Sequence, residues 1–506
     1  MKSPSFNRLG ILTATILGSS MVIMDSTVVN VILPRLQTEF QVSADQIQWV
    51  VEAYFLFLSA LILLGGALGD RFGRKCIFQL GTVLFIAASL GCALAGSLLQ
   101  LTVARALQGI GGALLTPGSL AIINATFPKA ERGRAIGTWA GFSAITSALG
   151  PVLGGWLTEE FSWRSVFLLN LPLGLLTLHF ARKFVPANCG ESEKSGRSRL
   201  DYRGALTSTF GLAGITFGLI ESSRLGFQDP RVFGSLGAGA LLLAHFLWLE
   251  LRTPSPLLPP ELFRSRAFTG ANFSTFLLYG ALGGVFFFLP FNLIQVQGFT
   301  PTQAGAANLP FVLILFILSR WTGGFHDRYG PRYPLVGGSL IAGVGFLLLG
   351  FLPGLLAGPT GQAGYWSAFF PGLIVFGIGM SFCVSPLTTA VLESVPTEHS
   401  GVGSGINNAI ARFAGLIAIA VMTLLILRSF KIHLKSELLH APNAAILARA
   451  SELAALDAPE ARVEIRRAYL ASFRELMGLS FLLALGSALC AFFTLKQAPP
   501  AARPKS

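Results

Sequence analysis

The chain reads Gly69-Asp70-Arg71-Phe72-Gly73-Arg74-Lys75 between two long apolar runs, and it reads His326-Asp327-Arg328-Tyr329-Gly330-Pro331-Arg332 between two others. The order Asp, Arg, aromatic residue, Gly is therefore present in both halves of the chain. Basic residues that only anchor a loop to lipid headgroups would not require the same Asp and Gly in both loops. We therefore predict two related halves, side by side in a membrane, with both loops on the same side.

The composition agrees with a membrane location. Of the 506 residues, 52% are hydrophobic and only 12% are charged, whereas soluble globular proteins carry about 25% charged residues. Glycine and phenylalanine are both abundant, with 57 and 42 copies. The chain has too few charges to cover a water-facing surface of ordinary size.

Fourteen apolar runs are long enough to cross a bilayer, which takes roughly 20 residues per helix. We predict spans near 9–33, 46–69, 76–96, 99–123, 133–157, 164–184, 203–222, 232–250, 267–292, 301–323, 333–355, 366–391, 400–428 and 473–496. The distance between the two related loops leaves room for six spans and two more between the halves.

The predicted fold class is an all-α polytopic membrane protein with two six-helix bundles and two inserted helices. The predicted division is an N-terminal bundle (1–184), a basic cytoplasmic loop (185–202), two inserted helices (203–250), five helices of the C-terminal bundle (251–428), an extracytoplasmic segment (429–472), the last span (473–496) and a cytoplasmic tail (497–506).

The basic residues predict the orientation. The net charge is +13, and the Lys and Arg side chains gather in alternate short loops, as expected for loops on the cytoplasmic side. We expect both termini in the cytoplasm, with the chain in the plasma membrane, most simply the inner membrane of a bacterium. This placement of the basic residues argues against a nucleic-acid partner.

Two segments leave alternatives open. The first apolar run could be a cleaved signal peptide, but it is long and contains Asp25, so we interpret it as a retained span. The segment 429–472 is rich in basic residues and would lie outside, where long loops translocate largely regardless of charge. It is either a folded flap or a docking surface for a partner.

The sequence gives little support for enzyme chemistry. The five cysteines form no CxxC or CxxH cluster, so we predict neither a metal site nor a disulfide framework. The sequence has no GxxxxGK[ST] phosphate-binding loop. We therefore expect no cofactor and no catalytic residues.

Five motifs together resemble the major facilitator superfamily, specifically its fourteen-span drug:proton antiporter branch with the methylenomycin-resistance and quaternary-ammonium exporters. They are Met24-Asp25-Ser26-Thr27-Val28-Val29-Asn30-Val31-Ile32-Leu33-Pro34, Gly65 to Lys75, Arg105-Ala106-Leu107-Gln108-Gly109, Gly150-Pro151-Val152-Leu153-Gly154-Gly155, and Asn407-Asn408 with Arg412. The chain departs from the branch at Thr146, where a glycine is usual, and at Glu52, where a neutral residue is usual.

The resemblance implies alternating access and proton-coupled export of hydrophobic or cationic drugs or toxic compounds, and hence a role in antibiotic resistance. Its partners would be a small hydrophobic substrate, protons and membrane lipids; a periplasmic adaptor stays undetermined. It implies a gating motif formed by Gly69, Asp70, Arg71, Gly73, Arg74, Asp327 and Arg328. It implies an antiporter motif formed by Gly150, Pro151, Gly154 and Gly155. It also implies a substrate site formed by Asn30, Asn408 and Arg412.

Three charged residues inside the first, second and fourth predicted spans are candidates for proton coupling. Asp25, Glu52 and Arg105 all fall in the outer half of the N-terminal bundle, and charges at such depth are costly. We hypothesise that Arg105 pairs with one carboxylate while the other carries the transported proton. The alternative is a purely structural salt bridge.

Other features have two interpretations each. Arg412, near the middle of its span, could bind an anionic group or a carbonyl-rich kink. Phe286, Phe287, Phe288 and Phe291 could line a substrate cavity or face lipid. The glycines of the fifth span serve packing, and the resemblance adds a flexing seam between the halves.

Two further function classes compete with drug export. Export of lipid or peptide, or nutrient uptake, would use the same fold with a different cavity. A non-transporting scaffold or sensor could bind partners through 429–472, but such a protein would not need charges inside the membrane.

Overall fold

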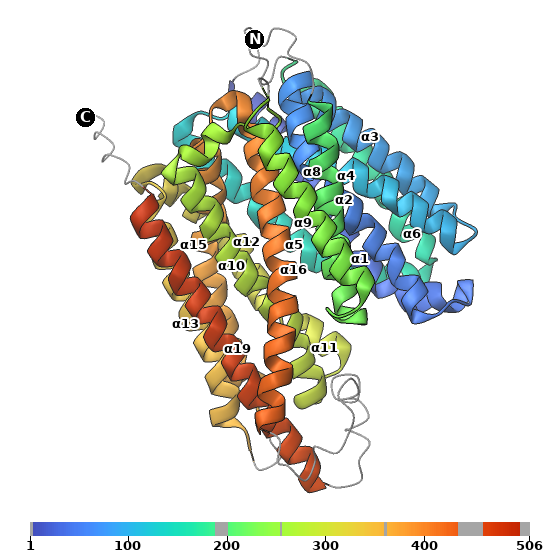
Figure 1. Ribbon diagram of the computed structural model, residues 1–506, viewed down its shortest axis with the longest axis vertical. Coiled ribbons are helices and arrows are strands. Elements are labelled where there is room, and N and C mark those ends of the chain that lie inside the picture. The colour runs from blue at the N-terminus through green and yellow to red at the C-terminus, as the bar shows by residue number, and fades with distance from the viewer. Residues whose placement is uncertain (1–3, 188–200, 254–255, 359–361, 434–458, 496–506) are drawn as a thin grey trace.

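Figure 1 shows the computed structural model, which describes residues 4–187, 201–253, 256–358, 362–433 and 459–495. All regular elements in these ranges are helices. They contain 14 helical segments that are long and apolar enough to cross a membrane. The predicted fold class is therefore confirmed.

The first six spans form one bundle. Its helices are α1 (Pro4–Phe40), α2 (Ala44–Phe72), α3 (Arg74–Ala93), α4 (Leu98–Thr126), α5 (Lys129–Glu160), and the pair α6 (Trp163–Leu168) and α7 (Asn170–Phe184), which together make the sixth span. Serine side chains cap several of these helices: the Ser43 hydroxyl accepts from the amide of Gln46 and the Ser97 hydroxyl from that of Gln100. Such caps bond the amides that have no partner within the helix.

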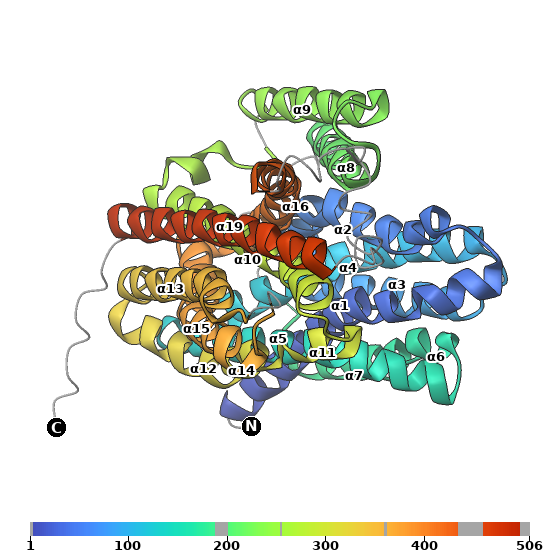
Figure 2. The ribbon, with the colours of Figure 1, turned by 90° about the horizontal axis from the view of Figure 1, so that it is seen from below.

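Helices α8 (Tyr202–Leu225) and α9 (Pro230–Glu250) form a hairpin outside the two bundles. Figure 2 shows α8 against α2 and α16, with α9 outermost. Asp201 and Asp229 cap the two helices through their carboxylates. The hairpin corresponds to the two inserted spans.

The remaining spans form the second bundle. Its elements are η1 (Pro260–Arg264), α10 (Arg266–Phe291), the π-helical turn η2 (Asn292–Val296), α11 (Pro301–Ala306), α12 (Leu309–Tyr329), α13 (Arg332–Leu356), α14 (Tyr365–Ala368), α15 (Phe370–Glu393), η3 (Thr397–His399), α16 (Ser400–His433) and α19 (Pro459–Thr494). The last helix begins at Pro459 and not near 473. The stretch after Pro459 is rich in helix-forming Ala, Glu, Arg and Leu, so this part of the predicted external segment continues the span. Residues 434–458 lie outside the described residues.

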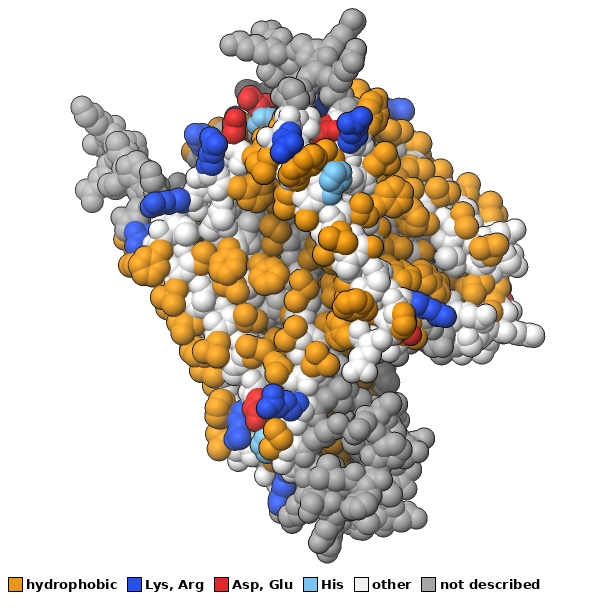
Figure 3. Space-filling view, viewed as in Figure 1, with side chains coloured by type: hydrophobic (Ala, Val, Ile, Leu, Met, Phe, Trp, Pro, Cys, Tyr) orange, Lys and Arg blue, Asp and Glu red, His pale blue; other side chains and the backbone are white. Residues whose placement is uncertain are grey.

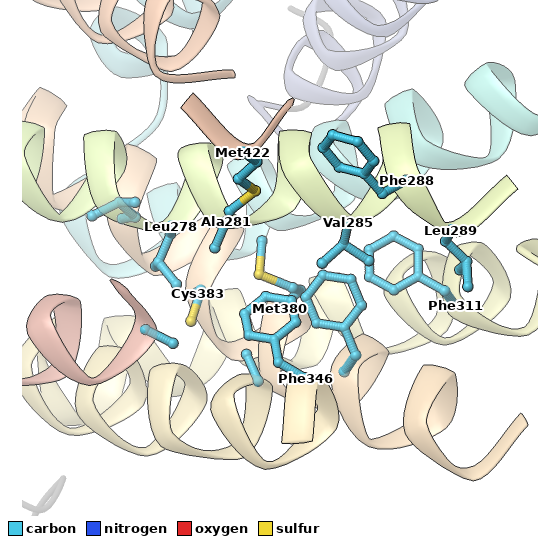
Figure 4. Packing of buried hydrophobic residues seen from close by; sticks show 14 of the residues in the cluster. Leu278, Ala281, Val285, Phe288, Leu289, Phe311, Phe346, Met380, Cys383 and Met422 are labelled. Carbon is cyan, nitrogen blue, oxygen red and sulfur yellow. The ribbon is translucent and has the colours of Figure 1, made fainter. Parts of the chain in front are cut away.

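The second bundle has a dense apolar core, drawn in Figure 4. Phe288 is 3% exposed there, and Phe286 packs its ring 5.0 Å from that of Phe311. Phe288 is therefore a core residue and the half-buried Phe286 packs against the same core, so a substrate cavity lined by these two stays a prediction. Phe287 and Phe291, by contrast, are 37% and 44% exposed.

The surface carries its apolar side chains in a broad middle zone (Figure 3), while Lys, Arg, Asp and Glu gather toward the two ends of the long axis. Exposed residues of this kind include Leu80, Phe210, Leu241, Ile317 and Leu355. An exposed apolar belt between two polar ends is the surface that a bilayer requires.

The two bundles meet through α5 against α12 and α15, and through α2 and α4 against α16. Their ribbons lie close together at the end where the chain begins and diverge toward the other end (Figure 1). We call these the closed end and the opposite end.

Candidate functional site

At the closed end, Asp70 crosses from the first bundle to the second. Its carboxylate accepts hydrogen bonds from the backbone amides of Gly401, at 2.9 Å, and Val402, at 2.8 Å, in the first turn of α16. A helix N-terminus carries partial positive charge and unpaired amides, so a carboxylate is well placed there. Asp70 therefore caps a helix of the opposite bundle.

Arg74 holds this cap in position. Its guanidinium is fully buried and bonds the Asp70 carboxylate at 2.8 Å. It also donates to the backbone carbonyl of Thr397, in the second bundle. Gly73 has a φ of +93°, a conformation that favours glycine, and it allows the immediate turn from α2 into α3.

The related loop makes the reciprocal contact. The Asp327 carboxylate accepts from the amides of Gly133, at 2.7 Å, and Arg134, at 3.0 Å, near the start of α5. Gly330 provides the turn, with a φ of +77°. Pro331 stands at the position equivalent to Arg74, so Asp327 lacks the arginine that supports Asp70.

Not every residue of the predicted gating motif crosses the seam. Arg71 and Arg328 lie 5.5 and 5.3 Å from the ring centroids of the neighbouring Phe72 and Tyr329. A methyl group built at Gly69 would meet no atom within 4 Å. Close approach depends instead on Gly66, where such a group would collide with the carbonyl of Gly401.

Two further hydrogen bonds close the seam. Asn124 on α4 donates to the Ser400 hydroxyl at 2.5 Å, and the Ser385 hydroxyl on α15 donates to the carbonyl of Gly133 at 3.1 Å. Gly133 and Gly323 face each other so closely that neither has room for a side chain. Sequence reasoning missed these contacts, although small residues on adjoining spans were a signal for them.

Away from the closed end, Asp25 forms a buried polar network. It follows the midpoint of α1 and is 1% exposed. One carboxylate oxygen pairs with the guanidinium of Arg105 on α4. The other accepts from Gln108, at 2.8 Å, and Asn170, at 2.9 Å. Three groups from two helices, α4 and α7, thus satisfy the Asp25 carboxylate.

Arg105 is held by several groups besides Asp25. Its Nε donates to the carbonyl of Val50 at 2.9 Å, and one terminal nitrogen also donates to Gln108 at 2.6 Å. The guanidinium lies 4.2 Å from the ring centroid of Tyr54, a cation–π distance. Its other terminal nitrogen is buried and has no hydrogen-bond partner among the described residues.

Sequence reasoning predicted Asp25 and Arg105 but missed the residues that surround them. Asn170 begins α7 and Ser89 lies on α3; Ser89 accepts from Gln108 at 2.8 Å and from Asn170 at 3.2 Å. Tyr54 is fully buried and donates to the carbonyl of Val22 at 3.0 Å. An Asn at the start of an apolar run was the available signal for Asn170.

The other predicted site residues lie on α1, α2 and α16. Glu52 is half-buried near the start of α2. Arg412 on α16 is within electrostatic range of Tyr54, so Tyr54 lies near an arginine of each bundle. Asn30 is exposed, and the amides of Asn30 and Asn408 donate to carbonyls of their own helices at 3.4 and 2.9 Å.

Asn407, unlike Asn408, donates hydrogen bonds to another helix. Its amide donates to Thr275 at 2.7 Å and to Asn272 at 3.2 Å, both on α10.

Within the described residues, no group of three His, Cys, Asp or Glu side chains is arranged to hold a metal ion.

The glycines of α5 serve two different contacts. Gly150 and Gly154 pack against Thr27 and Val28 of α1, within the same bundle. The contact between the halves is made nearer the closed end, where Gly137 faces the carbonyl of Ser319 on α12. The glycines of α5 that lie at the seam in this conformation therefore include Gly137 and Gly141, which face α12, because α5 turns different faces to α1 and α12.

Two more residues of that motif lie at the edge of the α1 contact. Pro151 is exposed, and a methyl group at Gly155 would make only an ordinary contact, 3.8 Å from Val31. The hydroxyl of Thr146, which replaces the usual glycine, donates to Ser20 of α1 at 3.1 Å. This departure therefore adds a hydrogen bond to the same helix pair.

The sequence profile of the Major Facilitator Superfamily matches residues 15–419. The chain is 34% identical to the multidrug resistance protein Stp of Mycobacterium tuberculosis, over 82% of this chain and 76% of the relative. It is 33% identical to the methylenomycin A resistance protein of Streptomyces coelicolor, over 81% and 84%. The fold is similar to that of the human organic anion transporter MFSD10 (TETRAN), with a TM-score of 0.62, 16% identity, and coverage of 95% of this chain and 99% of that one.

Proposed function

Because the chain belongs to the Major Facilitator Superfamily, we propose that it exports hydrophobic or cationic drugs or toxic compounds in exchange for protons. Its relatives include multidrug and antibiotic resistance proteins. A transporter confers resistance by lowering the concentration of the compound inside the cell, which favours export over uptake. The protein itself is a transporter and not an enzyme.

The closed end faces the cytoplasm in this proposal. Helix α1 begins there (Figure 1), and Arg71, Lys75 and Arg328 belong to the two loops whose aspartates form the caps at this end, as expected for cytoplasmic loops. The described conformation would then be sealed toward the cytoplasm. Breaking the Asp70 and Asp327 caps and forming a seal at the opposite end would give the alternate state, so the two caps serve as the cytoplasmic gate.

Proton coupling rests on the buried pairing of Arg105 with Asp25. In this proposal Asp25 holds the arginine, and the half-buried Glu52 is the second acid, which takes up and releases the transported proton. A carboxyl group's affinity for a proton falls when an arginine approaches it. If transport shifts Arg105 between the two acids, proton release follows the conformational change.

The substrate would bind where the two bundles face each other beyond the seam. Arg412, from the second bundle, approaches Tyr54, which is stacked by Arg105. A substrate that contacts both α2 and α16 would therefore be sensed by the residues that hold Asp25. Asn30 and Asn408 remain proposed contacts, because each side chain has more hydrogen-bonding groups than its bond to its own helix uses.

The decisive experiment uses the purified full chain in liposomes that hold a pH-sensitive dye and an imposed pH gradient. Candidate drugs are added in turn. Proton movement that requires a compound, and that is lost in Asp25→Asn and Glu52→Gln, would support antiport. Proton-driven transport retained in both variants would overturn the coupling assignment. Compound movement without proton movement would instead favour a different energy source or a lipid substrate.

A further inference from the structure

A cavity of about 1150 Å³ lies at the closed end, apart from the residues assigned to coupling. It is bounded by the start of α5, the start of α10, the junction of α12 and α13, and the ends of α15 and α19. The residues that matter for its chemistry are Lys129, Arg266, His326, Arg332, Glu393 and Phe492.

The acidic side chains of this cavity already have partners. The Asp327 carboxylate is bound by the amides of Gly133 and Arg134. Glu393 lies 3.2 Å from His326, and the buried Arg132 is within electrostatic range of both acids. Their negative charges are therefore compensated inside the protein.

The basic side chains of the cavity are not compensated in this way. Lys129, Arg266 and Arg332 form no salt bridge with any residue in the described ranges. Arg332 lies 4.0 Å from the ring centroid of Phe492, and its Nε is buried without a hydrogen-bond partner. His326 is 3% exposed, and its Nδ1 likewise has none. Counting only partners among the described residues, the cavity thus presents three cations without an ion pair and two buried nitrogens without a hydrogen bond.

We propose that this cavity binds the phosphate headgroup of an anionic phospholipid from the leaflet at the closed end. A guanidinium pair and an ammonium group are suited to phosphate oxygens. A lipid is favoured over a soluble anion because the adjacent Phe492 and Phe493, on a membrane-spanning helix, are 47% and 77% exposed. Acyl chains could pack on these rings while the headgroup enters the cavity.

The bound lipid would bridge the two bundles. Lys129 belongs to α5 of the first bundle, whereas Arg266 and Arg332 belong to α10 and α13 of the second. A phosphate that contacts both sides holds α5 near α12, beside the Asp327 cap. Anionic lipid would therefore favour the conformation in which the closed end is sealed.

The test titrates the purified full chain in neutral detergent with short-chain phosphatidylglycerol and measures bound lipid by native mass spectrometry. We expect Arg266→Gln and Arg332→Gln each to weaken binding about fivefold, the effect of removing one basic residue from an anionic lipid surface. Lys129→Gln should weaken it similarly if the lipid bridges the bundles. Arg266 is exposed and unpaired, so its variant should fold normally.

Arg252→Gln is the matched control, because Arg252 lies 4.3 Å from the ring centroid of Trp248 near the end of α9 but does not line the cavity. It should bind lipid as the parent chain does. Equal loss in the control, or equal binding of phosphatidylcholine, would overturn the site. Binding of inorganic phosphate with the same affinity would overturn the lipid assignment, and wild-type binding by Lys129→Gln would overturn the bridge. None of these readouts requires transport, so they are separate from the test of antiport.

Discussion

Asp70 on α2 accepts a hydrogen bond of 2.8 Å from the backbone amide of Val402 on α16. Asp327 makes the reciprocal contact with α5, so each bundle caps a helix of the other. The two caps differ in one respect, because Arg74 supports Asp70 whereas Pro331 occupies the equivalent position beside Asp327. The contact that Asp70 makes between the bundles should therefore be more stable than the contact that Asp327 makes.

This difference predicts unequal effects of removing the two charges. Asp70→Asn should destabilise the closed end by about 3–5 kcal/mol, because it leaves the buried Arg74 without its carboxylate. Asp327→Asn should cost only about 0.5–2 kcal/mol, the usual value of a helix cap, because the buried Arg132 near Asp327 keeps Glu393 as a countercharge. Thermal unfolding and transport rate, measured for both variants, check the order. Equal effects would mean that Arg74 does not strengthen the first cap.

The pairing of Asp25 with Arg105 predicts a compensating double variant. Arg105→Gln should destabilise the protein by about 3–5 kcal/mol, because the Asp25 charge is then buried without its partner. Asp25→Asn with Arg105→Gln should recover most of that stability, since no buried charge remains. Proton movement should stay absent in the double variant. If the double variant is as unstable as Arg105→Gln, the pair is not the source of the loss.

The sequence predicted the fold well, because each span carries its own apolar run and the two related loops fix the two-bundle arrangement. The partners within the site were harder to predict. Whether Arg105 pairs with Asp25 or Glu52 depends on how α1, α2 and α4 pack, which spacing along the chain does not determine. Asn170 was missed because it is a single polar residue beside an apolar run. The sequence predicted a role for Gly69 and not for Gly66, because nothing in the sequence shows which glycine lies against the other bundle. Only the structure shows that Gly66 is the one that contacts Gly401.

Removing the charge of Glu52 and removing that of Asp25 should have different effects on thermal stability, although both changes should affect proton coupling. Glu52→Gln should abolish compound-dependent proton movement while leaving the thermal unfolding temperature close to that of the parent chain, because Glu52 is only half-buried. Asp25→Asn should lower that temperature, since it leaves Arg105 buried without a countercharge. Proton-flux and thermal unfolding assays on the same preparations make the comparison. Coupling that survives Glu52→Gln would reassign the transported proton to Asp25.

Substitutions at two glycines of α5 should distinguish an effect on folding from an effect on the conformational change of transport. Gly137 faces α12 of the other bundle, whereas Gly154 faces Val28 of α1 in its own bundle. A leucine at Gly137 should push the bundles apart at the closed end and stop transport, with little loss of thermal stability, because each bundle keeps its own core. Gly154→Leu should also stop transport, but it should lower stability by about 1–3 kcal/mol through overpacking inside the first bundle.

Gly337→Leu is the control for added apolar bulk, because a methyl group at that glycine would meet no atom within 4 Å. It should leave both transport and stability near the parent values. Cysteine labelling at the closed end would report whether Gly137→Leu opens it, and the expected result is faster labelling than in Gly154→Leu. Intact transport in Gly137→Leu would show that α5 and α12 need not come this close during the cycle, and the seal would then rest on the two aspartate caps alone.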